Sequence, residues 1–286
     1  MSEVGFPAKD REFVVDAHSL LTAISRVKVE GDATRSYLAD AFAQLERLAG
    51  SIRHRDAPQL LSDPTICALL PKVYAVRAEF EYAQEDAAAR AALADSNSAQ
   101  SIERHVAAKV TMLPRKFFDA LGQRDPILFA GSGPFPTTAM AIAGVTGRSV
   151  TCLDRNADAN ALARRFADAG GFATRLSFLD GRLEDFTELA DYACIVGAFL
   201  LGVGNSAEPG RAKTCLVERT ANALAPGARL LLRTPVGAGG LIYPVVRPEL
   251  PVGFKICPYL QDGASSLPYD RPFLLIERLA SGVSDE

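Results

Sequence analysis

Two closely spaced glycines and a distant aspartate form the clearest candidate ligand site in this chain. The apolar run 127–130 leads into Gly131, Ser132 and Gly133, and Asp154 follows about 20 residues later, the spacing at which an acid meets the ribose in adenosine-binding folds. Apolar residues that end at such glycines predict a strand, a tight turn and a helix, with backbone that a ligand can approach closely. A carboxylate at the end of the next strand can accept hydrogen bonds from ribose hydroxyls. We therefore expect an adenosine-containing ligand.

The residues around the turn indicate which adenosine ligand to expect. Pro134 and Pro136 lack the backbone N–H groups that a pyrophosphate would need, and no third glycine follows at the dinucleotide spacing. The chain also lacks the G-K-[ST] sequence of a Walker-type ATP site. We therefore expect S-adenosylmethionine as co-substrate, with Pro134 as part of its site. The alternative is a purely structural glycine turn, with the aspartate as a helix cap.

Acidic residues crowd one predicted helix, and they could supply a general base. Glu81 and Glu85 are four residues apart and share a helix face, whereas Glu79 points elsewhere, and aromatic residues lie between them. Burial disfavours the charged form of a carboxylic acid, so a partly desolvated glutamate has a raised pKa and can take a proton from a substrate. The alternative is a solvated helix surface, which is the more common role of a charge cluster.

Helical segments before residue 122 must position these glutamates. Asp63 and Pro64 have the residue types of a helix cap and a first helical residue. We expect Pro71 to interrupt the pattern, so that the glutamates lie on a helix that begins after it. Residues 1–122 are therefore predicted to form a helical N-terminal domain. The predicted helical segments cover residues 11–55, 72–95 and 102–121.

The rest of the chain alternates strands with helices. Residues 123–286 are predicted to form a Rossmann-like domain that binds S-adenosylmethionine, and the order resembles that of class I S-adenosylmethionine-dependent methyltransferases within the α/β class. Asp180, after the third strand, would face the adenine amino group or simply form a turn. Ala198, after the fourth strand, is a further expected cofactor contact. The predicted strands are 127–130, 149–153, 174–179, 192–197 and 228–233, followed by an antiparallel edge pair at 254–257 and 273–278.

Composition excludes several classes of function. The 286 residues carry a net charge of −3, which gives no electrostatic reason to expect binding to nucleic acid or to an anionic membrane surface. The five cysteines are scattered without a C-x-x-C pair, and no ligand cluster predicts a bound metal. The N-terminus has no signal-peptide pattern, and no segment is long and apolar enough to cross a bilayer. These features are typical of a cytoplasmic protein.

Three stretches together resemble the nicotianamine synthases. They are Phe129 to Thr138 with its Gly-Ser-Gly-Pro-x-Pro sequence, Asp154 to Asn160, and residues 225–246, which end in Tyr-Pro-Val-Val. A methyltransferase usually has an acid two positions before the first glycine, where this chain has Phe129. The resemblance extends over roughly residues 70 to 280 and is firmest after residue 127.

The resemblance implies transfer of the 3-amino-3-carboxypropyl group of S-adenosylmethionine to the amine of a small-molecule acceptor, with release of methylthioadenosine. The short chain is most similar to the bacterial branch, in which an amino acid, here expected to be histidine, is the acceptor in opine metallophore biosynthesis of the staphylopine and pseudopaline type. An opine-type dehydrogenase would then act downstream, and the chain could form a homodimer. The alternatives are a small-molecule methyltransferase and a non-catalytic protein that binds S-adenosylmethionine.

The resemblance also implies roles for particular residues. In that family a helical N-terminal domain covers the active site and supplies a glutamate, so residues 1–122 are expected to do the same. The glutamate corresponds to Glu79 or Glu81, with Glu85 as a third candidate. Where the family has a tyrosine before the glycine motif, the equivalent by counting is His105, whose alternative role is that of a surface histidine. Two candidates for holding a carboxylate or the acceptor are Arg233, which ends a central strand, and Tyr243, which could instead simply pack.

Overall fold

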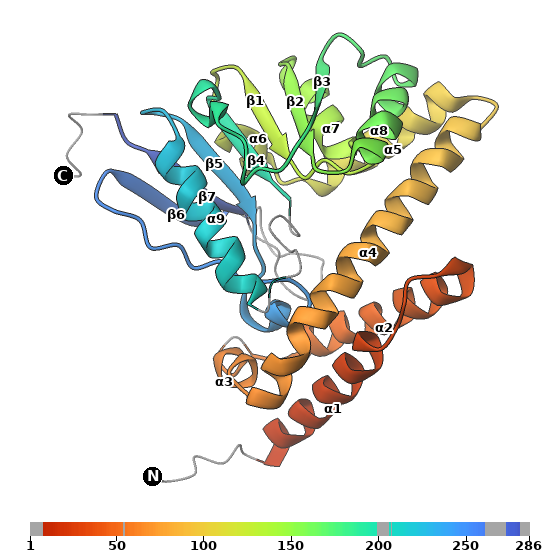
Figure 1. The fold of residues 1–286 in the computed structure, drawn as a ribbon, viewed down its shortest axis with the longest axis vertical. Helices are drawn as coiled ribbons and strands as arrows, with labels where there is room; N and C mark the ends of the chain where they lie inside the picture. The colour runs from red at the N-terminus through yellow and green to blue at the C-terminus, as the bar shows by residue number, and fades with distance from the viewer. Residues whose placement is uncertain (1–7, 54, 199–205, 207, 261–272, 281–286) are drawn as a thin grey trace.

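The N-terminal part of the molecule is a bundle of helices, as the sequence predicts (Figure 1). The computed structural model describes residues 8–53, 55–198, 206, 208–260 and 273–280. Apolar side chains from the first helices, including Leu21, Leu45 and Val73, meet in one buried cluster and remove the apolar faces of these helices from water. The helices of this part are α1 Ala8–Ser25, α2 Gly31–Ser51, α3 Ala57–Leu61 and α4 Pro64–Ala94.

Helix α4 is longer than the sequence predicts. Its cap is as expected, because a carboxylate oxygen of Asp63 accepts hydrogen bonds from the N–H groups of Thr65 and Ile66 at 2.8 and 3.2 Å. The expected interruption at Pro71 is wrong, since this proline lies inside a continuous helix. Ile66 before the proline and Val73 after it are both fully buried in the same cluster. Their burial offsets the roughly 3 kcal/mol that an interior proline costs.

The described residues beyond the helical part form a twisted sheet of seven strands in the order β3-β2-β1-β4-β5-β7-β6. β1 to β5 are parallel, and β7 pairs antiparallel with both β5 and β6. This confirms the predicted α/β fold and the antiparallel pair at one edge. The strands are β1 Ile127–Ala130, β2 Val150–Asp154, β3 Leu176–Asp180, β4 Cys194–Gly197, β5 Arg229–Arg233, β6 Phe254–Leu260 and β7 Phe273–Arg278.

Helices cover both faces of the sheet, which is why the central strands are apolar throughout. In β1, Ile127 and Phe129 enter the cluster on one face, whereas Leu128 and Ala130 enter the cluster on the other. The first face is covered by α5 to α8, and the second mainly by α9 and η1. These elements are α5 Ser98–Met112, α6 Arg115–Ala120, α7 Thr137–Thr146, α8 Ala157–Ala169, η1 Glu188–Asp191 and α9 Pro209–Ala223, with the short η2 Gly237–Leu241 after β5.

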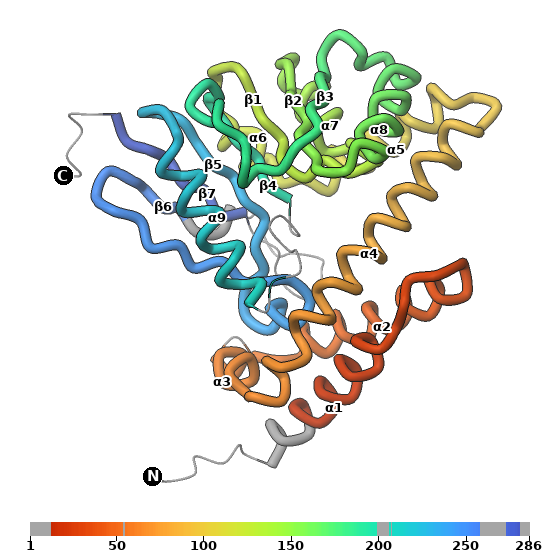
Figure 2. The backbone as a smooth tube through the Cα atoms, viewed as in Figure 1, coloured from red at the N-terminus to blue at the C-terminus, as the bar shows by residue number. Residues whose placement is uncertain are grey.

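Helix α4 connects the helical bundle to the sheet, as Figures 1 and 2 show. Its first half packs in the N-terminal cluster together with Ala238 and Leu241 of η2. Near its end, Ala89 and Ala92 join the cluster beneath the sheet, as do residues of α5 and α6. The predicted domain boundary at residue 122 stays a prediction. In the structure, α4 contributes side chains to both the N-terminal apolar cluster and the cluster beneath the sheet. None of the described helices is both long and apolar enough to span a membrane.

Candidate active site

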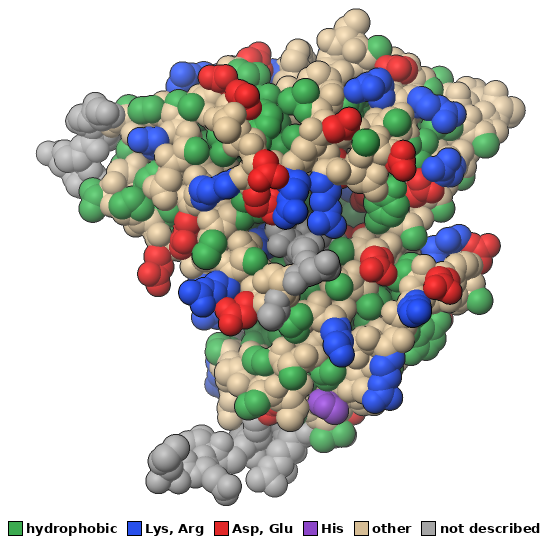
Figure 3. Space-filling view, in the orientation of Figure 1, with side chains coloured by type: hydrophobic (Ala, Val, Ile, Leu, Met, Phe, Trp, Pro, Cys, Tyr) green, Lys and Arg blue, Asp and Glu red, His purple; other side chains and the backbone are tan. Residues whose placement is uncertain are grey.

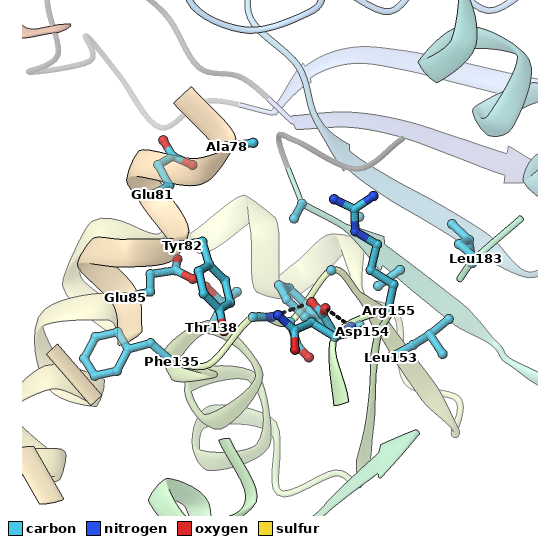
Figure 4. Close-up of a pocket in the computed structure, with 18 of the residues that line it drawn as sticks. Ala78, Glu81, Tyr82, Glu85, Phe135, Thr138, Leu153, Asp154, Arg155 and Leu183 are labelled. Atoms are coloured by element: carbon cyan, nitrogen blue, oxygen red, sulfur yellow. Dashed lines mark hydrogen bonds between the residues drawn. The ribbon is translucent and has the colours of Figure 1, made fainter. Parts of the chain in front are cut away.

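A cleft of about 600 Å³ lies between α4 and the C-terminal ends of the parallel strands. This is the position at which parallel α/β sheets bind ligands. The connections that follow neighbouring strands there go to opposite faces of the sheet, and they leave a crevice between them. Figure 3 shows acidic and basic side chains gathered on the face where the helical part and the sheet meet, and Figure 4 shows the pocket itself. The charged side chains that line it include Glu79, Glu81, Glu85, Lys109, Asp154 and Arg233.

The glycine turn forms one wall of the cleft. Gly131 and Gly133 have φ angles of +77° and +62°, which lie in the left-handed region that favours glycine. The N–H of Gly133 donates to one carboxylate oxygen of Asp154 at 2.8 Å, and the N–H of Asn156 donates to the other at 3.0 Å. Asp154 therefore joins the turn after β1 to the start of α8 while it lines the cleft (Figure 4).

The turn has features that fit an adenosyl ligand. The hydroxyl of Ser132 is buried and has no hydrogen-bond partner among the described residues. A buried hydroxyl without a partner costs free energy, so a ligand atom that bonds to it would stabilise the complex. Ala198 also lines the cleft, at the end of β4. Pro134 is not among the lining residues, although its neighbours on both sides are.

Asn160 is a functional candidate that the sequence reasoning missed. Its side chain is buried, and its amide donates to the carbonyl oxygen of Leu179 at 2.8 Å and to the carboxylate of Asp180 at 2.7 Å. It thereby fastens the end of β3 to α8. Asp180 is exposed and lies outside the cleft lining, which at this strand end is formed by residues 181–184. The contact of Asp180 with adenine stays a prediction, and the exposed position of this side chain outside the cleft lining does not favour it.

Glu81 is held by partners from distant parts of the chain. One of its carboxylate oxygens accepts a hydrogen bond from Nε of Arg77 at 2.7 Å and another from the hydroxyl of Tyr243. A guanidinium of Arg77 also donates to that hydroxyl at 2.6 Å. Hydrogen bonds from a cation and from a phenol to the same carboxylate oxygen fix the orientation of the Glu81 side chain.

Tyr243 is fully buried and does not line the cleft. Its predicted contact with substrate stays a prediction, and its hydrogen bonds favour a role in positioning Glu81 instead. Arg77 is equally enclosed, since its guanidinium lies 4.6 Å from the ring centre of Phe42 and 3.4 Å from a carboxylate oxygen of Glu46. The i,i+4 spacing in the sequence indicates that Arg77 and Glu81 can pair. It gives no sign that Tyr243, 162 residues after Glu81, bonds to the same carboxylate.

Glu85 and Lys109 have perturbed proton affinities in the cleft. Burial, and then the negative charge of Glu81, raises the pKa of Glu85 to about 8, although the charge of Lys109 acts in the opposite direction. The pKa of Lys109 is lowered by burial and then by the positive charge of Arg233. Titratable groups perturbed by both burial and neighbouring charge are typical of functional sites.

His105 does not line the cleft. It is exposed, and its ring packs edge to face against Phe135 with 5.0 Å between the ring centres. Its catalytic role stays a prediction, and the structure favours Lys109, one turn further along α5, as the cleft-facing residue of this helix. The i,i+4 spacing of the two residues was the signal that could have found it.

Arg233 reaches the cleft from the end of β5, as its position at the carboxyl end of a central strand predicts. Its guanidinium lies 5.2 Å from the ring centre of Phe273, which also lines the cleft. Glu79, in contrast, is an exposed member of the lining. Within the described ranges, no three His, Cys, Asp or Glu side chains come together in a way that could hold a metal ion.

Comparisons with known proteins identify the family and the overall fold of this chain. The sequence profile of the nicotianamine synthase protein family matches residues 59–263. Nicotianamine synthase 9 of Hordeum vulgare is 35% identical over 130 residues, which are 43% of this chain and 36% of that protein. An L-histidine 2-aminobutanoyltransferase of Pseudomonas aeruginosa is 29% identical over 132 residues, or 46% of each chain. The match thus spans less than half the length of these curated relatives.

A solved structure shares the whole fold. It is a glutamate-to-glutamine mutant of MtNAS in complex with S-adenosylmethionine, with a TM-score of 0.69 and 17% identity. The superposition covers 96% of this chain and 100% of that one. The helical part and the sheet are therefore arranged in the same overall fold as in that protein.

Proposed function

This chain belongs to the nicotianamine synthase family, and from that premise we propose that it transfers the 3-amino-3-carboxypropyl group of S-adenosylmethionine to the amine of an amino acid. The observation that carries the proposal is one cleft that contains both the glycine turn with Asp154 and the carboxylates of α4. Such a cleft can hold an adenosyl ligand on one side and an incoming ammonium group on the other. The MtNAS structure with S-adenosylmethionine supports this choice of ligand.

The sheet side of the cleft would bind the adenosyl group. Asp154 is placed to accept hydrogen bonds from ribose hydroxyls, and the buried hydroxyl of Ser132 is placed to bond to a polar atom of the ligand. The glycines of the turn let the backbone approach the ligand closely. Bound S-adenosylmethionine supplies a methylene carbon activated by a positively charged sulfur atom.

The α4 side would bind and deprotonate the acceptor. In the transfer, the amine nitrogen forms a bond to the methylene carbon, the carbon–sulfur bond breaks, and its electron pair remains on sulfur. The ammonium group must first lose a proton, because its protonated form has no lone pair to attack with. A nearby carboxylate can accept that proton.

The surroundings of the three glutamates support one choice of proton acceptor. Glu81 is already bonded to Arg77 and Tyr243, and Glu85 lies against the glycine turn. Glu79 lines the cleft, is exposed, and has no hydrogen-bond or ion-pair partner among the described residues. Glu79 is therefore the proposed proton acceptor, and the held carboxylate of Glu81 would attract the ammonium group.

Two cationic side chains face these carboxylates. Lys109 and Arg233 line the same cleft and can bind the carboxylate groups of the methionine arm or of the acceptor. A cleft lined by both negative and positive groups suits zwitterionic ligands. This distribution of charge supports an amino acid as acceptor.

Histidine is the proposed acceptor, since a P. aeruginosa relative is an L-histidine 2-aminobutanoyltransferase. The product would then serve opine metallophore biosynthesis in the cytoplasm, with an opine-type dehydrogenase as the next enzyme. Metal would enter as a ligand of the final product, not as a cofactor of this protein. A homodimer is part of the same proposal.

The test is product analysis by mass spectrometry. The protein is incubated with S-adenosylmethionine and single amino acids, histidine among them, and methylthioadenosine should appear together with an acceptor enlarged by the three-carbon amino-acid arm. S-adenosylhomocysteine as the adenosyl product would instead identify a methyltransferase. Binding without any turnover would identify a non-catalytic protein. Among the Glu79→Gln, Glu81→Gln and Glu85→Gln variants, Glu79→Gln should reduce the transfer rate most at saturating substrates.

A further inference from the structure

Glu85 and Asp154 flank the same glycine. A Cβ atom built on Gly133 would lie 2.6 Å from Oε2 of Glu85, closer than real Cβ contacts, so the carboxyl group rests directly on the backbone of the turn. The N–H of Gly133 donates to Asp154 at 2.8 Å. Figure 4 shows Glu85 on α4 and Asp154 at the end of β2, both in the pocket. A ligand seated on this turn must therefore contact both acids or lie between them.

This arrangement locates the sulfur of an adenosyl ligand relative to Glu85, given the binding mode in the proposed function. In S-adenosylmethionine a single methylene group separates the ribose ring from the sulfur. A ribose held by Asp154 therefore brings the sulfur close to Gly133, on which Glu85 rests. Among the acids of α4, Glu85 is thus the one whose carboxyl group contacts the glycine turn directly.

The groups around Glu85 make its charge sensitive to a new cation. Glu81 on α4 and Asp154 on β2 are negative, whereas Lys109 on α5 is positive, and Arg155 and Arg233 line the same cleft. Burial and the charge of Glu81 raise the pKa of Glu85 to about 8, so at neutral pH this group is mostly protonated before a ligand binds. A positive charge placed nearby favours the carboxylate and releases the proton.

We propose that Glu85 distinguishes the positively charged sulfonium of the co-substrate from the neutral thioether of the spent product. The proposal rests on the proposed function for the identity of the ligand. Binding of the sulfonium displaces one proton from Glu85 to solvent. When the carbon–sulfur bond breaks, the electron pair neutralises the sulfur, and Glu85 takes up a proton again. The ionic attraction is then lost, so the product binds more weakly than the co-substrate.

Calorimetric titration without any acceptor measures this directly. S-adenosylhomocysteine is the matched neutral ligand, because it has the same adenosyl and amino-acid parts and lacks only the methyl group and the charge. For a single proton released on binding, affinity for S-adenosylmethionine should rise by up to about tenfold per pH unit as the pH approaches 8, and then level off. Affinity for S-adenosylhomocysteine should change far less. The titration is then repeated near pH 7 in buffers with different ionisation enthalpies. It should show about one proton released when S-adenosylmethionine binds, and far less when S-adenosylhomocysteine binds.

Variants identify the group responsible. Glu85→Gln should remove the difference in pH dependence between the two ligands, whereas Glu85→Asp, which keeps a titrating carboxyl, should retain it. Asp86→Asn is the matched control, because Asp86 is the neighbouring acid and pairs with Arg90 outside the cleft. This control should behave like the parent protein.

Equal pH dependence for both ligands in the parent protein would overturn the proposal, as would a difference that survives in Glu85→Gln. The comparison in the parent protein decides the matter even if a variant fails to fold. Because no acceptor or turnover is involved, a negative result here is separate from a failure to form methylthioadenosine, which would count against the proposed function.

Discussion

Replacing Arg77 by methionine tests how strongly the site depends on the buried guanidinium that holds Glu81. Methionine keeps much of the apolar volume against Phe42 but removes the charge and all the hydrogen-bond donors. The change removes the cation shared by the carboxylates of Glu81 and Glu46, and it removes the hydrogen bond that the guanidinium donates to the hydroxyl of Tyr243. The variant therefore measures the network and not the packing alone.

The expected loss follows from the exposure of the partners. The side chain of Arg77 is 9% exposed, and those of Glu81 and Glu46 are 28% and 20% exposed. Removing one member of a fully buried ion pair costs about 3–5 kcal/mol, and partial exposure of the acids reduces this to about 2–3 kcal/mol in free energy of unfolding. For a chain of this size the thermal midpoint should fall by roughly 5–10 °C.

Urea and thermal unfolding of the whole chain provide the assay, with Arg90→Met as the matched control. Arg90 also lies on α4 and pairs with an acid four residues away, but its side chain is 63% exposed. Because a solvated ion pair contributes little, the control should unfold like the parent protein. Equal losses in the two variants, or no loss in Arg77→Met, would refute the view that a buried network fixes Glu81.

Three further predictions concern the glycine turn and Glu85. Gly133→Ala should lower the free energy of unfolding by about 1–2 kcal/mol, because a side chain at φ +62° is strained, and it should weaken S-adenosylmethionine binding in calorimetry, because the added Cβ would press on Glu85; unchanged affinity would contradict the close contact. Ser132→Ala should weaken binding by roughly 1 kcal/mol yet leave the thermal midpoint of the unliganded protein unchanged or higher, since its hydroxyl has no partner among the described residues; a destabilised apoprotein would argue against this. The folded-state pKa of Glu85, about 8, lies above its ordinary value, so its stabilisation is complete at low pH and is lost as pH rises toward 8. Relative to Glu85→Gln, the parent protein should therefore lose up to about 1.4 kcal/mol of unfolding free energy per pH unit between about pH 5 and 8, and parallel urea curves would contradict the raised pKa.

The sheet and its ligand-binding end were predictable because their signals are local. Each strand is a short apolar run bounded by turn residues, and the positive φ angles at Gly131 and Gly133 require the residue type that the sequence shows there. The predicted α/β fold, with its antiparallel edge pair, and the family resemblance are both confirmed. In contrast, the continuous helix through Pro71 depends on burial of side chains on both sides of it, which a single-residue rule does not include.

The contacts that assign roles within the site were less accessible to sequence reasoning. Tyr243 meets Glu81 across 162 positions, and only the packing of η2 against the N-terminal helices brings them together. The sequence favoured His105 on α5, but Lys109, one turn further along the same helix face, is the residue that lines the cleft. The three glutamates of α4 were predictable as a group, whereas their separate surroundings come from other elements.

The central claim is that the three-carbon arm of the co-substrate, and not its methyl group, is transferred. The most direct test uses S-adenosylmethionine labelled with one isotope in the methyl group and another in the arm, followed by mass spectrometry of both products. The proposed reaction predicts the arm label in the enlarged amino acid and the methyl label in methylthioadenosine. Methyl label on the acceptor, with the arm label retained in S-adenosylhomocysteine, would contradict it.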